Sequence, residues 1–101
     1  PRIILGNSRR PTGKILVEMT GGSSGHPGIY KHLAHSGVRT LVCMHLSEDH
    51  FKKVADASLN VVIAGHISSD TLGMNLILDG VEKREQLEII CCSGFNRVKR
   101  H

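Results

Sequence analysis

One short segment restricts the possible folds of this chain more than any other. Residues 61–64 (Val-Val-Ile-Ala) are apolar without alternation, which predicts a short strand buried on both faces. Gly65 interrupts the run, and the side chains that follow recur at helical spacing: Ile67, Thr71, Met74, Leu78 and Val81. We therefore expect a strand that turns directly into a helix, with His66 at the junction.

Strand and helix signals alternate along the rest of the chain. Apolar runs typical of strands cover residues 15–19, 38–44 and 87–92, and a shorter apolar run covers residues 3–5. Helices are expected over residues 27–37, from Ser47 onward, and from His66 to an end between residues 79 and 85. This order predicts an α/β fold with alternating strands and helices in a layered sheet, formed by one domain of residues 1–101.

The amino-acid composition limits the classes of protein to which this chain can belong. The chain has 101 residues, with 13 Lys and Arg against 9 Asp and Glu, and a formal net charge of +4 with neutral His. The basic residues gather near both ends, but no aromatic residue is interleaved with the basic residues of either end, and no nucleic-acid recognition helix is recognisable. Solvated basic ends are therefore expected rather than a nucleic-acid-binding surface. No run of about eighteen apolar residues occurs, so we expect no membrane-spanning helix.

The three cysteines, Cys43, Cys91 and Cys92, form no Cys-x-x-Cys pair, so a structural zinc site is not indicated. We expect reduced core residues of a cytoplasmic protein, with Cys91 and Cys92 pointing to opposite faces of a strand. The chain begins with Pro1 rather than Met and lacks the apolar segment of a signal peptide. It is therefore expected to be a fragment or a processed chain.

His66 and Asp70 lie about one helical turn apart, so both side chains can face the same point. An imidazole and a carboxylate in this arrangement are common ligands of a divalent metal. An isolated His-x-x-x-Asp pattern more often combines a loop histidine with a carboxylate that suits the positive end of a helix. From this pair alone, both interpretations are open.

Residues 44–50 (Met-His-Leu-Ser-Glu-Asp-His) follow another expected strand and hold two histidines and two carboxylates. Such a cluster suits metal binding or proton transfer, and equally suits a helix start with acidic capping residues and an exposed histidine. The loops that hold His45 and His66 should open on one edge of the sheet, which favours the functional interpretation. Three other histidines, on or beside the first helix, are expected at the surface: His26, His32 and His35.

A glycine-rich turn precedes the first helix and consists of Gly21, Gly22, Ser23, Ser24 and Gly25. Backbone N–H groups in such a turn can cradle the phosphate of a nucleotide or another phosphorylated small molecule. The turn is not a P-loop, because no Gly-Lys-Ser/Thr follows it. A flexible connection is the commoner role, and both roles are open.

Taken in order, these motifs resemble the C-terminal half of the NIF-three-like proteins, also labelled GTP cyclohydrolase I type 2. The resemblance covers about residues 15–95 and depends on three segments: the turn at 21–25, the loop at 44–50 and the Gly-His-x-x-x-Asp pattern at 65–70. Its most specific part is Ala64-Gly65-His66, followed by Asp70, Leu72, Gly73 and Asn75. The family carries Glu where this chain has Asp70, which shortens the reach of the carboxylate by one methylene.

The resemblance implies one lobe of a two-lobed α/β protein with a dinuclear metal centre between the lobes. It assigns His66 and Asp70 as metal ligands, with His45 near the site, and zinc, manganese or iron as the metal. The family's first lobe, which supplies a His-His pair and an Asp, has no counterpart in residues 1–101. The chain would thus contribute half of the metal site of a hydrolase, and by itself it is not expected to hydrolyse GTP.

The same resemblance implies a homo-oligomer, because family members form ring-like assemblies. This property suits a second interpretation equally well, in which the chain is a metal-stabilised oligomerisation or regulatory module without catalysis. The sequence motifs alone leave the hydrolase and the module open.

Overall fold

The computed structural model describes residues 1–20 and 25–100, and the chain divides into two compact units, Pro1–His66 and Ile67–His101. The described elements of unit 1 are the strands β1 (Arg2–Leu5), β2 (Lys14–Glu18), β3 (Val38–Cys43) and β4 (Asn60–Ile63), and the helices α1 (Ile29–His35) and α2 (Glu48–Asp56). The long helix α3 (His66–Glu82) begins at the last residue of unit 1 and provides the regular structure of unit 2.

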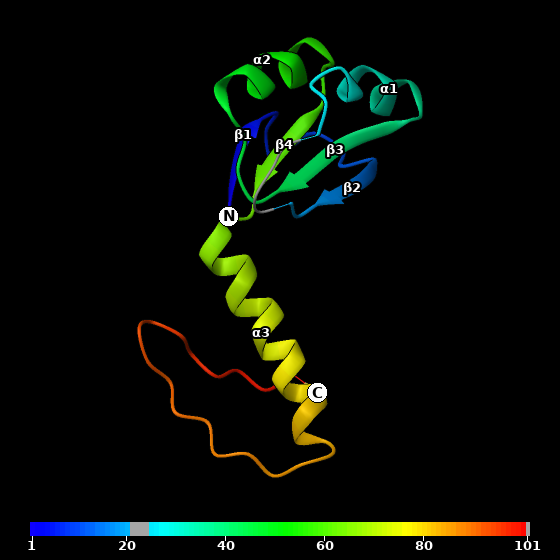
Figure 1. Ribbon diagram of the computed structural model, residues 1–101. Helices are drawn as coiled ribbons and strands as arrows, with labels where there is room; N and C mark the ends of the chain where they lie inside the picture. Colours follow the sequence, from blue (N-terminus) through cyan, green and yellow to red (C-terminus); the bar gives the residue numbers. More distant parts are fainter. Residues whose placement is uncertain (21–24, 101) are drawn as a thin grey trace. The chain divides into compact units, whose positions relative to one another are not determined.

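The sheet of unit 1 has the strand order β1-β4-β3-β2. Strands β2, β3 and β4 run parallel, whereas β1 pairs antiparallel with β4. Helices α1 and α2 lie over the same face of this sheet (Figure 1). The mixed sheet with its helices confirms the predicted α/β fold class, and its parallel part brings the carboxyl ends of β2, β3 and β4 to one edge, as the sequence predicted.

Local sequence signals explain where several elements begin. Ser47 is the N-cap of α2, and its hydroxyl accepts a hydrogen bond of 3.3 Å from the backbone N–H of His50. Glu48 and Asp49 follow in the first turn, where their charges are favoured by the helix dipole. The strand predicted at residues 61–64 is present as β4, one residue earlier.

The core of unit 1 lies between the sheet and the two helices. Its buried residues are mostly aliphatic and consist of Tyr30, Val38, Leu41, Cys43, Val54, Leu59 and Val61. Val54 of α2 and Val61 of β4 are completely buried, and burial of one such side chain stabilises the fold by about 1.5 to 3 kcal/mol. The burial predicted for β4 on both faces is complete only at Val61, because Val62 and Ile63 are half-buried.

Unit 2 consists of α3 from Ile67 onward and a chain segment, residues 83–100, that leaves the helix and returns to it (Figure 1). Two buried polar residues of α3 hold the returning segment. The side chain of Asn75 donates to the carbonyl of Asn96 (3.0 Å) and accepts from the backbone N–H of Val98 (2.8 Å). Asp79 binds the guanidinium of Arg97 at 2.5 Å. The segment is therefore attached through side-chain contacts rather than through a sheet.

The strand predicted at residues 87–92 is wrong, because these residues form no regular secondary structure. In unit 1 the position beside β4 is occupied by β1, a pairing that the short apolar run at residues 3–5 did not reveal. The prediction that Cys91 and Cys92 are core residues is also wrong, since both are exposed. Cys43 is buried as predicted, and all three cysteines are free thiols. Leu87 and Ile90, two large apolar side chains of the run at residues 87–92, are exposed as well.

Candidate metal centre

The ends of two parallel strands place His45 and His66 beside each other. The hydrogen bonds between β3 and β4 continue past the strands, because Ala64 N–H donates to the carbonyl of Cys43 (2.8 Å) and Gly65 N–H to that of Met44 (3.2 Å). Gly65 has a φ of +91°, a left-handed conformation that glycine adopts without steric cost. The chain therefore turns immediately after β4, and His66 begins α3 at this point.

The imidazole rings of His45 and His66 have centroids 6.0 Å apart and planes inclined by 30°. Both residues are exposed, so an ion can reach them from solvent. Because Zn–N bonds are about 2.0 Å long, two imidazoles on one ion have centroids separated by roughly 5 to 6 Å. The separation of this histidine pair is thus compatible with two ligands of one metal.

Asp70 lies on α3 four residues after His66, as the sequence predicted, and it belongs to unit 2. Asp70 and His66 each make an interaction within the chain. Within residues 1–20 and 25–100, no three His, Cys, Asp or Glu side chains are grouped closely enough to hold a metal ion together. The histidine pair is therefore the part of the predicted site that unit 1 assembles.

For the loop at residues 44–50 we expected either a cluster for metal binding or proton transfer, or a helix start with an exposed histidine. His50 matches neither expectation. It is neither exposed nor close to the pair, but buried at the start of α2, where its Nδ1 is hydrogen-bonded to the hydroxyl of Tyr30 at 2.6 Å. Burial raises the pKa of the Tyr30 phenol, and the neighbouring charges of Cys43 and Glu18 raise it further. Burial likewise raises the pKa of the Cys43 thiol. The sequence motifs did not indicate Tyr30, whose only signal is that it is the single tyrosine of the chain.

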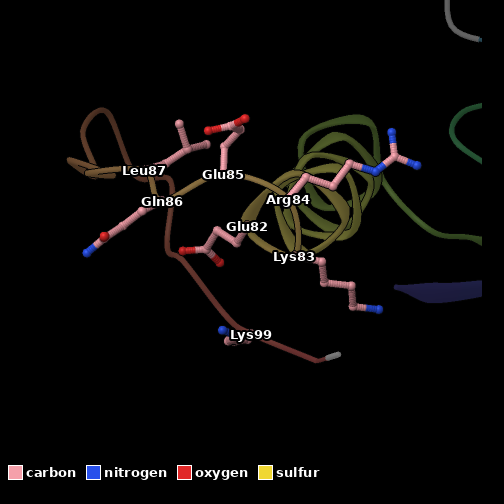
Figure 2. A pocket seen from close by; sticks show the side chains of 7 residues that line it. All are labelled: Glu82, Lys83, Arg84, Glu85, Gln86, Leu87 and Lys99. Carbon is pink, nitrogen blue, oxygen red and sulfur yellow. The ribbon is translucent and has the colours of Figure 1, made fainter.

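The other predicted site residues contribute less. Of the glycine-rich turn, residues 21–24 lie outside the described residues, and Gly25 is exposed. The histidines of the first helical region, His26, His32 and His35, are exposed as predicted. A depression of about 410 Å³ lies in unit 2 at the end of α3, but the side chains of Lys83, Arg84 and Glu85 diverge around it (Figure 2). Because these charges do not converge on one point, we assign it no ligand.

Comparison with protein-family models, curated proteins and solved structures found no match to this chain. None of the helices in the described ranges is long and apolar enough to cross a bilayer. What the fold and the site define together is an α/β protein with a histidine pair at the carboxyl edge of its parallel strands.

Proposed function

We propose that this chain supplies part of a divalent-metal site of a NIF-three-like hydrolase. His45 and His66 bind the metal, and the family resemblance implies Asp70, four residues after His66, as a further ligand. The observation that carries this proposal is the 6.0 Å separation of the two imidazole rings beyond the ends of β3 and β4. Carboxyl ends of parallel strands are where ligands generally bind in open α/β sheets.

The donor set fits zinc, manganese or iron, because imidazole and carboxylate are ligands that these ions accept. The two imidazoles leave coordination positions open for a carboxylate, for water or for ligands from another lobe. A bound ion at such a site lowers the pKa of its water and polarises the bond under attack. The residues of this chain hold and orient the ion, and a nucleotide or similar phosphorylated molecule is the substrate class that the family resemblance supports.

Titration calorimetry with Zn²⁺ tests the metal site. We expect His66→Ala to abolish binding and His45→Ala to weaken it at least about tenfold, whereas Asp70→Ala weakens it and Asp70→Glu retains it. His35→Ala is the matched control, since it removes another exposed histidine, which lies on α1 outside the pair. Equal zinc uptake by the wild type and His66→Ala would refute the assignment.

Catalysis is tested separately. The isolated chain, loaded with Zn²⁺ or Mn²⁺, is expected to show no turnover of GTP, because one histidine pair and one carboxylate provide only part of a dinuclear centre. Multiple turnovers that His66→Ala abolishes would contradict the proposal that the chain holds only half of the site.

A second candidate function, a metal-stabilised oligomerisation module, is favoured by a different observation. Helix α3 exposes several large apolar side chains, namely Leu72, Met74, Leu76 and Ile77. Apolar side chains gathered on one element often mark a surface for protein association. Sedimentation of the wild type with Zn²⁺ and with EDTA measures whether assembly depends on metal. Metal-dependent assembly favours the module if no hydrolysis is detected after the metal ligands of the missing first lobe are added.

A further inference from the structure

A cavity of about 330 Å³ lies in unit 1 at the carboxyl end of β2, between that strand and α1. Most of its wall is aliphatic and is formed by Leu16, Ile29, Leu33 and Leu41. The lining also includes two residues with polar side-chain groups, Glu18 and Tyr30. The cavity thus joins an apolar chamber to a polar end, which is the usual composition of a small-molecule site.

Both polar groups are held in place by the protein. Glu18 Oε1 accepts a hydrogen bond of 2.8 Å from the backbone N–H of Thr20, which leaves Oε2 as the second acceptor of the carboxylate. The Tyr30 hydroxyl is fixed by its 2.6 Å hydrogen bond to the buried His50. When His50 is the tautomer with hydrogen on Nε2, the phenol donates this bond and its oxygen keeps lone pairs for a donor on a ligand. In this tautomer the polar end is a preorganised set of acceptors.

The electrostatics of this end favour a cation. Glu18 is the one charged side chain among the described residues that line the cavity. Burial, together with the nearby Cys43 and Glu18, raises the pKa of the Tyr30 phenol, so this end of the cavity disfavours a negative charge. An anion such as phosphate would meet the same repulsion. A divalent metal would find one carboxylate among aliphatic side chains, too few ligands to replace its hydration shell.

We propose that this cavity binds a small organic cation, a primary ammonium group joined to an apolar body. The ammonium donates hydrogen bonds to Glu18 Oε2 and to the Tyr30 hydroxyl oxygen, and the apolar body lies against Leu16, Leu33 and Leu41. This site is separate from the histidine pair and does not depend on the proposed hydrolase function. Its ligand differs in charge from the phosphate that the glycine-rich sequence at residues 21–25 suggests.

Tyrosine fluorescence of the full chain provides the assay. The chain contains one Tyr and no Trp, so its tyrosine emission reports on Tyr30 alone. We would titrate benzylamine, benzyl alcohol, benzoate and inorganic phosphate at neutral pH. Benzylamine should change the emission with a dissociation constant on the order of 1 mM, as expected for so small a probe. It should bind at least about tenfold more tightly than benzyl alcohol, because only the cation forms a charge-assisted hydrogen bond with Glu18.

Two variants separate the charge from the shape of the site. Glu18→Gln keeps the side-chain length and an oxygen for Thr20 N–H but removes the charge, so benzylamine and benzyl alcohol should then bind equally. Glu85→Gln removes one exposed carboxylate of unit 2 and should leave both affinities unchanged. Methyl NMR signals of Leu33 and Leu41 should shift with benzylamine in the wild type. Benzoate or phosphate binding as tightly as benzylamine, or an unchanged preference in Glu18→Gln, would overturn the proposal.

Discussion

Replacing Tyr30 with phenylalanine would test whether the buried hydrogen bond between α1 and α2 stabilises unit 1. The substitution keeps the ring and removes only the hydroxyl that is 2.6 Å from His50 Nδ1. Tyr30 and His50 are 7% and 9% exposed, so water has little access to the nitrogen that loses its partner. A buried polar group without a hydrogen bond costs about 1 to 3 kcal/mol, and we expect the free energy of unfolding to fall by that amount.

A urea titration followed by the methyl NMR signals of Val54 and Val61 measures this loss. Both side chains are fully buried in the core of unit 1, so their signals report on this unit. An unchanged free energy of unfolding in Tyr30→Phe would refute the conclusion that the hydrogen bond stabilises the core.

The pH dependence gives an independent check on the same residue. The pKa of Tyr30 is raised in the folded state, so the folded chain holds this proton more tightly than the unfolded chain. The stability due to the protonated phenol is complete below the unfolded pKa of about 10 and is lost as the pH rises through the folded value. Tyr30→Phe removes this loss and keeps the contribution of Cys43, whose pKa is also raised. Ultraviolet absorbance, in which Tyr30 is the single tyrosine, should show ionisation at higher pH in the folded chain than in urea.

Two further predictions concern unit 2. Asn75→Ala removes the acceptor of the Val98 N–H and a donor to the carbonyl of Asn96. The amide of Val98 should therefore exchange its hydrogen at least about tenfold faster. An unchanged exchange rate would show that the returning segment is held by other contacts. A thiol reagent should modify Cys91 and Cys92 rapidly in the native chain and Cys43 only after unfolding, and mass spectrometry of Cys91→Ser and Cys43→Ser assigns the modified residues.

Local signals in the sequence were sufficient to predict several elements of this protein. The apolar run at residues 61–64, the interruption at Gly65 and the helical spacing after His66 specify a strand, a turn and a helix without reference to the rest of the chain. The N-cap at Ser47 is equally local, because its hydroxyl bonds a backbone group three residues away. The α/β class followed from the alternation of such elements.

The sequence also predicted part of the candidate metal site. Parallel strands have their carboxyl ends at one edge, so the loops after β3 and β4 were expected to meet, and His45 and His66 do lie 6.0 Å apart. Spacing alone could not show which histidine of the loop at residues 44–50 belongs to the pair. His45 and His50 belong to the same loop region, yet the start of α2 turns His50 into the core and leaves His45 exposed.

Tertiary structure alone decided the features that depend on distant partners. The pairing of β1 with β4, the buried contact of Tyr30 with His50 and the attachment of residues 96–98 to Asn75 each join residues about twenty or more positions apart. The apolar run at residues 87–92 has the composition of a strand, but a strand also needs hydrogen-bonding partners along its length. Periodicity and composition describe which face of an element is apolar, whereas the partner that covers this face is chosen by the packing of the whole unit.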